Sequence, residues 1–178
     1  MTRALLVIDM LNDFVAPAGS LRVPDTERVL PRIVEEVADA RLRGEPVVYV
    51  CDAHEPDDRE FERMGWPAHA VKGTWGGRVV DALAPGPDDP VVEKTTYSGF
   101  YNSRLDSVLR ERGVDTVRLT GCVTNICVLY TAADAAMRGY RVEVVEDAVA
   151  GLDPQDHAFA LRQMETVLGA RRVRREET

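Results

Sequence analysis

Residues 116–145, TVRLTGCVTNICVLYTAADAAMRGYRVEVV, contain the pattern that decides the fold. The stretch opens and closes with short Val-containing runs, at residues 116–120 and 141–145, and residues 125–138 between them have helical character and end at Gly139. Short apolar runs that are bounded by Gly or charged residues are typical of parallel strands covered on both faces. The stretch therefore predicts a strand, a helix and a second, parallel strand.

The same alternation continues on both sides of this stretch. Further strands are predicted at residues 4–8, 46–51, 91–92 and 172–174, and further helices at residues 29–42, 104–112 and 154–168. The last helix has Asp153 as its N-cap and Pro154 at its first position. We therefore predict a three-layer α/β/α architecture with a mainly parallel sheet of about six strands.

Length and composition predict a single globular domain over residues 1–178. The chain is 45% hydrophobic and 29% charged, which is ordinary for a folded domain of this size. Its net charge of −8 argues against binding to nucleic acid or to an anionic membrane surface. The apolar run before Asp9 is too short for a signal peptide or a membrane span, so a cytoplasmic location is expected.

Two further features of the sequence, its cysteines and its C-terminal arginines, are interpreted as structural and not as catalytic. An odd number of cysteines, Cys51, Cys122 and Cys127, argues against a disulfide framework, and we interpret Cys51 and Cys122 as structural. The C-terminal arginines are interpreted as a solvated end or an edge strand, because two glutamates follow them directly. These residues are Arg171, Arg172, Arg174, Arg175, Glu176 and Glu177.

Candidate catalytic residues follow the predicted strands, where ligands of such sheets bind. Cys127 lies near the start of a helix, and the helix dipole is expected to lower the pKa of its thiol and make it a nucleophile. The alternative for Cys127 is a small buried apolar residue. Asp9 and Lys94, each just past a strand, are the candidates for a base and for a cation that stabilises charge. Taken singly, each residue favours a structural interpretation, Asp9 as a helix or turn cap and Lys94 as a solvated lysine at a strand end.

A second set of strand-end residues indicates a metal site. Asp52 and His54 lie two apart at the end of a strand and share a face, and His69 follows in the same long segment. One carboxylate and two imidazoles suit Zn²⁺, Mn²⁺ or Fe²⁺ with open coordination positions. Glu60 or Glu62 could supply a fourth ligand or hold a ligated water. The alternative is a pair of loop histidines that cap or pack.

The segment from residue 52 to residue 77 contains these metal candidates. It is predicted to be irregular over about 26 residues, and so long a loop within a domain is typically functional.

Three separated motifs, in order along the chain, resemble those of the isochorismatase-like cysteine hydrolases. They are LLVIDMLNDF at residues 5–14, EKTTYSGF at residues 93–100 and the segment at residues 119–151. The resemblance implies a triad of Asp9, Lys94 and Cys127, in which Cys127 attacks an amide carbonyl and forms a thioester acyl-enzyme. It also implies a cis peptide between Cys122 and Val123, with the N–H groups of Val123 and Cys127 as the oxyanion hole.

Within this family the chain resembles the nicotinamidases. The similarity lies in Asp52-Ala53-His54 and in WPAHAVKGTWG at residues 66–76. It implies that Asp52, His54 and His69 hold a metal ion that binds the pyridine nitrogen of nicotinamide, in an enzyme of NAD salvage. It further implies that aromatic residues, Phe14 and Trp66 with Tyr97 or Tyr101, surround the substrate. Relatives are commonly oligomers, so a homo-oligomer is expected.

The chain departs from the family pattern at two positions. Leu11 stands where a Gln is common, and Ala53 stands where nicotinamidases often have Trp. Both departures concern the substrate pocket. The alternative functions are therefore a hydrolase of the same family acting on another small amide or on isochorismate, and an inactive member that binds a ligand or an assembly partner.

Overall fold

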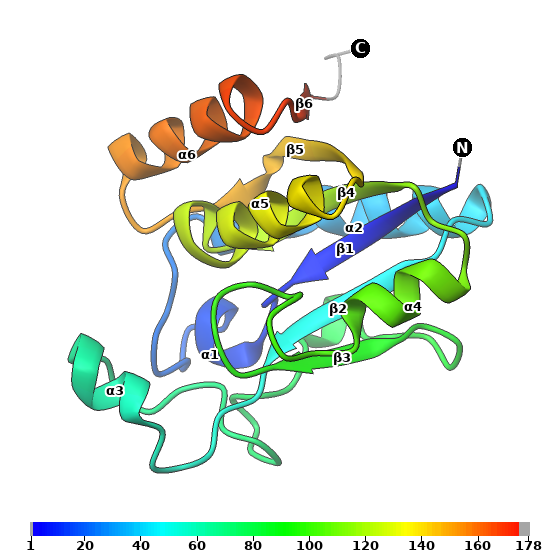
Figure 1. Cartoon of the computed structure of the whole chain (residues 1–178). Helices are drawn as coiled ribbons and strands as arrows, with labels where there is room; N and C mark the ends of the chain where they lie inside the picture. The colour runs from blue at the N-terminus through cyan, green and yellow to red at the C-terminus, as the bar shows by residue number, and fades with distance from the viewer. Residues whose placement is uncertain (1, 175–178) are drawn as a thin grey trace.

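Figure 1 shows the computed structural model of the chain, which describes residues 2–174. Within these residues one parallel sheet has six strands in the order β3-β2-β1-β4-β5-β6. The strands are β1 (Arg3–Ile8), β2 (Val47–Asp52), β3 (Val91–Lys94), β4 (Thr116–Cys122), β5 (Arg141–Ala150) and β6 (Arg171–Val173). The helices are α1 (Asn12–Val15), α2 (Thr26–Leu42), α3 (Arg59–Met64), α4 (Leu105–Glu111), α5 (Leu129–Met137) and α6 (Pro154–Thr166).

Helices cover both faces of the sheet, so the predicted three-layer fold is confirmed (Figure 1). Successive side chains of a strand point to opposite faces. In β1, Leu6 and Ile8 are buried with residues of α4, α5 and α6, whereas Leu5 and Val7 are buried with residues of α2. Each strand therefore contributes to two apolar layers, which is why its sequence is apolar at consecutive positions.

Several elements differ from the sequence-based expectation. β5 continues to Ala150, five residues further than predicted, because a register shift lets Val149 and Ala150 pair with Gly121 and Cys122 of β4. The predicted helix over residues 125–138 begins with a π-helical turn, Thr124–Val128, before α5. The segment from residue 52 to residue 77 is not irregular throughout, because it contains α3, which has Asp58 as its N-cap.

The predicted C-terminal strand is β6, at the edge of the sheet beside β5. Its arginines are paired, since Arg171 contacts Glu143 and Arg172 contacts Glu146. Arg174 follows β6 and lies 3.8 Å from Glu146, whereas Arg175, Glu176 and Glu177 lie outside the described residues. No helix within residues 2–174 is long and apolar enough to cross a membrane.

Candidate active site

The structure brings Asp9, Lys94 and Cys127 together at the carboxyl ends of the central strands. Asp9 follows β1, Lys94 ends β3, and Cys127 lies in the π-helical turn after β4. The Lys94 Nζ atom is 2.8 Å from Asp9 Oδ2 and 3.3 Å from Cys127 Sγ. Lys94 also contacts Oδ1 of Asp52. All of these side chains are buried, so an amine, a thiol and two carboxylates share one site that is shielded from water.

Backbone contacts fix the position of the Asp9 carboxylate. Asp9 has a positive φ of 52°, in the left-handed region, which turns its side chain out of the line of β1. Asp9 Oδ1 accepts a hydrogen bond from the backbone N–H of Asp52 at 2.7 Å. The Cys122 thiol donates to the backbone carbonyl of Asp9 at 3.3 Å. Asp52 of β2 therefore positions the Asp9 carboxylate, and Cys122 of β4 contacts the Asp9 backbone.

The nucleophile segment approaches β1 closely through Gly121. Gly121 has a φ of +108°, and a Cβ atom there would lie 2.0 Å from the carbonyl oxygen of Ile8. Only glycine fits between the two strands at this point. The peptide bond between Cys122 and Val123, which follow Gly121, is cis, as the resemblance implied.

The electrostatics of the triad follow from burial and from its mixed charges. Burial, together with the negative charge of Asp52, raises the pKa of Asp9 to about 6, although Lys94 opposes this shift. Burial alone would lower the pKa of Lys94, but Asp52 and Asp9 raise it well above its ordinary value. Lys94 therefore remains an ammonium ion.

The expectation that the pKa of Cys127 is lowered is wrong. Burial raises the pKa of the Cys127 thiol well above its ordinary value. Lys94 lowers this pKa, but Asp9 and Asp52 raise it and so offset part of the effect of Lys94. Cys127 is 6% exposed, so loss of solvation dominates over any helix dipole. The resting residue is a thiol, and its proton must pass to a base before or during attack.

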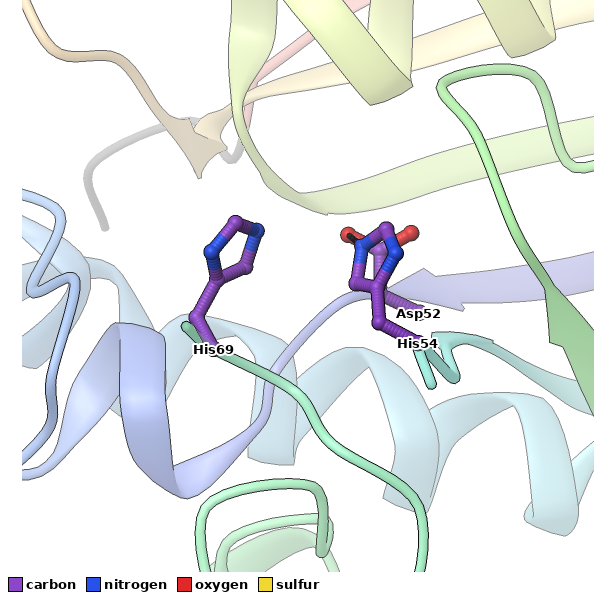
Figure 2. A group of neighbouring side chains, drawn as sticks. All are labelled: Asp52, His54 and His69. Atoms are coloured by element: carbon purple, nitrogen blue, oxygen red, sulfur yellow. Dashed lines mark ion pairs between the residues drawn. The ribbon is translucent and has the colours of Figure 1, made fainter. Parts of the chain in front are cut away.

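The predicted metal ligands also lie together. Figure 2 shows Asp52, His54 and His69, whose ligand atoms lie within 4.8 Å of one another. The His54 Nε2 atom is 3.7 Å from Asp52 Oδ2 and 3.9 Å from an oxygen of Glu60. Of the two glutamates considered, Glu60 is buried and lies near His54, whereas Glu62 is exposed.

These residues fit a divalent cation. In the described part of the chain, His54 Nε2 is a buried nitrogen with no hydrogen-bond partner. Such a nitrogen is costly to bury unless something binds it. Burial alone would lower the pKa of His54, but Asp52, Asp58 and Glu60 raise it to about 9, so negative charge surrounds the ring. His69 is oriented by its Nδ1 atom, which lies 2.8 Å from the carbonyl oxygen of Pro67.

Asn12 and Asp13 hold the segment that carries His69, a role that sequence reasoning missed. Asp13 Oδ2 accepts a hydrogen bond from the backbone of Ala70 at 2.9 Å, and Asn12 Nδ2 donates to the carbonyl of Trp75 at 2.8 Å. A Cβ atom on Gly76 would lie 2.0 Å from the Asp13 carboxylate. The sequence offers one signal for this role, a pair of polar residues three and four positions after the strand-end Asp9.

A small cavity connects the thiol to the metal candidates. Its lining is mostly apolar and consists of Phe14, Leu21, Val23, Asp52, Glu60, Trp66, His69, Tyr97, Val123, Ile126, Cys127 and Leu152. Phe14, Trp66 and Tyr97 thus lie where the resemblance implied. Tyr101 does not: it is 62% exposed, because its neighbour Phe100 occupies the buried side of the same turn.

Comparison with known proteins shows similarity to one protein family. A family model described as the isochorismatase domain matches residues 3–173. N-carbamoylsarcosine amidase from Thermoplasma acidophilum is 42% identical, with a TM-score of 0.89 over 100% of this chain and 99% of that one.

Two other solved structures with similar TM-scores are named for a different activity. Pyrazinamidase of Pyrococcus horikoshii, in complex with zinc, is 33% identical, with a TM-score of 0.92 over 98% of this chain and 100% of that one. The pyrazinamidase/nicotinamidase of Streptococcus mutans is 39% identical, with a TM-score of 0.90 over 97% and 100%.

Proposed function

Given that the chain belongs to the isochorismatase family of hydrolases, we propose that it is a metal-containing cysteine amidohydrolase that converts nicotinamide into nicotinate and ammonia. The observation that carries the proposal is a single cavity, with aromatic walls, that joins the Cys127 thiol to His69, Asp52 and Glu60. A flat neutral amide of this kind needs apolar walls, one nucleophile at its carboxamide and one polar contact at its ring nitrogen. This reaction would place the enzyme in NAD salvage in the cytoplasm.

The triad performs the reaction in two halves. The Asp9 carboxylate takes the thiol proton as Cys127 Sγ bonds to the carboxamide carbon. Asp9 returns that proton to the amide nitrogen, the C–N bond breaks, and ammonia leaves a thioester on Cys127. A water molecule then gives a proton to Asp9 and its oxygen to the acyl carbon. The C–S bond breaks, the thiol is regenerated, and nicotinate leaves.

Lys94 and two backbone N–H groups stabilise charge during these steps. The Lys94 ammonium, 3.3 Å from Cys127 Sγ and 2.8 Å from Asp9 Oδ2, stabilises both the thiolate and the carboxylate. We assign the N–H groups of Val123 and Cys127 to the oxyanion. Removal of one such donor typically costs about 10²–10³ in kcat.

Asp52, His54, His69 and Glu60 would hold the metal ion. When bound, a divalent ion would act as a Lewis acid at the pyridine nitrogen and so fix the orientation of the ring. Two nitrogens and carboxylate oxygens suit Zn²⁺ first, with Mn²⁺ or Fe²⁺ as alternatives. The zinc in the Pyrococcus horikoshii pyrazinamidase supports Zn²⁺.

A second candidate is hydrolysis of an N-carbamoyl amino acid, which the 42% identity to N-carbamoylsarcosine amidase favours. Sarcosine carries a carboxylate, and a buried carboxylate requires a cationic partner. Within the described residues, the lining of the cavity includes no lysine or arginine, and it does include Asp52 and Glu60. A metal ion held by Asp52, His69 and Glu60 would itself be such a cationic partner, so it is the aromatic walls of the cavity, and not its charge, that favour the flat neutral amide.

The test is ammonia release from nicotinamide, pyrazinamide and N-carbamoylsarcosine, each with and without a chelator. We expect turnover of the two aromatic amides, its loss on chelation and its recovery with Zn²⁺. Trp66→Ala should raise KM for nicotinamide, whereas Trp75→Ala should not, because the Trp75 side chain is 48% exposed and lies outside the cavity lining. Turnover of N-carbamoylsarcosine alone would overturn the proposed substrate.

A further inference from the structure

The Asp58 carboxylate connects two of the candidate metal ligands. Its Oδ2 atom lies 2.9 Å from Nδ1 of His54. Its Oδ1 atom accepts a hydrogen bond from the backbone N–H of Glu60, also at 2.9 Å. Asp58 is therefore in contact with the ring of one ligand and with the main chain of another.

We propose that Asp58 is a positioning residue that orients His54 and Glu60 toward a bound metal ion. This inference rests on the proposed function, because it requires the metal site to be real. A carboxylate that accepts the Nδ1 proton of a histidine fixes both the ring orientation and the tautomer, and it leaves the Nε2 lone pair available to a metal. Here, within the described residues, His54 Nε2 is a buried nitrogen without a hydrogen-bond partner, and it lies 3.7 Å from an oxygen of Asp52 and 3.9 Å from one of Glu60.

The two histidines of the site are held in different ways. The Nδ1 atom of His69 lies 2.8 Å from a backbone carbonyl, that of Pro67, which no side-chain substitution removes. The Nδ1 atom of His54 depends on the side chain of Asp58. A single substitution can therefore release one ligand and leave the other in place, which makes the inference testable.

Asp58 is also the N-cap of α3, so a cap that only stabilises the helix is the competing explanation. Serine is a good N-cap but is too short to reach the His54 ring. Asparagine is also a good N-cap, keeps the length of the side chain and offers a neutral acceptor to Nδ1. Asp153, the N-cap of α6, accepts hydrogen bonds from Gln155 and Asp156 and provides a matched control, because it caps a helix and is not one of the metal candidates.

The experiment measures Zn²⁺ affinity by competition with a chromophoric chelator, after the metal has been stripped from each protein. We expect Asp58→Ser to weaken Zn²⁺ binding about 10–100-fold, the usual cost of losing such an outer partner. Asp58→Asn should lose less, and Asp153→Ser should match the wild type. The melting temperatures of the metal-free Asp58→Ser and Asp153→Ser proteins should both stay close to that of the wild type, because serine preserves each N-cap.

The outcomes separate the inference from the proposed function. Wild-type Zn²⁺ affinity in Asp58→Ser, while the wild type binds Zn²⁺ normally, would overturn the role of Asp58 and leave the amidase proposal standing. Failure of the wild-type protein to bind Zn²⁺, Mn²⁺ or Fe²⁺ would overturn both. If Asp58→Ser does not fold, Asp58→Asn decides: it must bind Zn²⁺ more weakly than the wild type, and equal affinity contradicts the inference.

Discussion

At the scale of single residues, the site depends on moving one proton from a buried thiol to a buried carboxylate. The pKa of Cys127 is raised by burial, and that of Asp9 is raised to about 6 by burial and by Asp52. Lys94 is the cation between them, and it lowers the cost of placing negative charge on either. Asp9 is thus more basic than an exposed aspartate, which suits a base that must deprotonate a thiol.

Asp9→Asn should lower kcat for nicotinamide by about 10²–10⁴-fold, the usual contribution of a general base. The substitution keeps the shape of the side chain, and asparagine tolerates the positive φ at this position. Asp25→Asn is a matched control, because Asp25 also has a positive φ but has an exposed side chain. The measurement is steady-state ammonia release at equal metal content. An Asp9→Asn enzyme with wild-type kcat would exclude Asp9 as the base.

At the scale of elements, the short helix α1 supports the loop that carries His69. Asn12 and Asp13 together bond to Ala70 and Trp75, so the end of β1 is tied to a segment almost 60 residues further along the chain. Gly76 leaves room for the Asp13 carboxylate. The position of His69 relative to Asp52 therefore depends on contacts made by α1.

Gly76→Ala should disturb this support. The added methyl group overlaps Asp13, and overpacking of this kind typically costs about 1–3 kcal/mol in the free energy of unfolding. Zn²⁺ affinity should fall as well, because the His69 segment must shift. Gly73→Asn is the control: Gly73 has a φ of +75° and open space around it, and asparagine accepts that conformation. Chemical denaturation and chelator competition measure both effects, and equal results for the two variants would contradict this role of Gly76.

The sequence predicted the strands and the residues at their ends, because a parallel sheet places the carboxyl ends of neighbouring strands at one edge. Asp9, Lys94, Asp52 and His54 were found in this way. Asp58 was not found, because its role depends on the orientation of the His54 ring, which tertiary contacts set. The raised pKa of Cys127 was missed for the same reason, since position along a helix says nothing of burial. The exposure of Tyr101 likewise depends on which side of a turn is covered.

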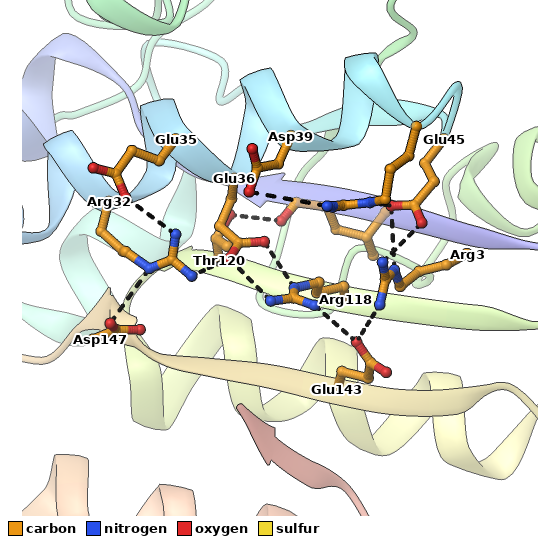
Figure 3. Close-up of polar contacts among 12 residues, drawn as sticks. Arg3, Arg32, Glu35, Glu36, Asp39, Glu45, Arg118, Thr120, Glu143 and Asp147 are labelled. Atoms are coloured by element: carbon orange, nitrogen blue, oxygen red, sulfur yellow. Dashed lines mark hydrogen bonds and ion pairs between the residues drawn. The ribbon is translucent and has the colours of Figure 1, made fainter. Parts of the chain in front are cut away.

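At the scale of the whole molecule, an ion network joins α2 to four strands of the sheet, β1, β4, β5 and β6, and Figure 3 shows its central residues. Arg118 of β4 lies between Glu36 of α2 and Glu143 of β5. Glu143 is also 3.2 Å from Arg3 of β1 and contacts Arg171 of β6. Burial alone would raise the pKa of Glu143, but Arg171, Arg3 and Arg118 hold it below its ordinary value.

Glu143 should therefore stabilise the fold in a pH-dependent way. Because its pKa is lower in the folded state, its contribution is complete above the unfolded pKa of about 4.3 and is lost as the pH falls through the folded value. Glu143→Gln should cost about 1–3 kcal/mol at neutral pH, since Arg171 loses its ion pair with Glu143 and Arg3 and Arg118 each lose one of their ion pairs. Denaturation of both proteins from pH 7 to pH 3 measures the difference in stability. The difference should shrink below about pH 4, and a difference that stays constant with pH would contradict the role of the carboxylate.

The central claim is that Cys127 is the nucleophile of an amidase. The most direct measurement is ammonia release from nicotinamide by Cys127→Ala, beside Cys51→Ala as a control cysteine that is buried in β2 outside the triad. Cys127→Ala should lose about 10⁴–10⁶-fold in kcat, as hydrolases do when one member of a nucleophile–base set is removed, while Cys51→Ala retains activity. Turnover by Cys127→Ala at the rate of the wild-type enzyme would contradict the claim.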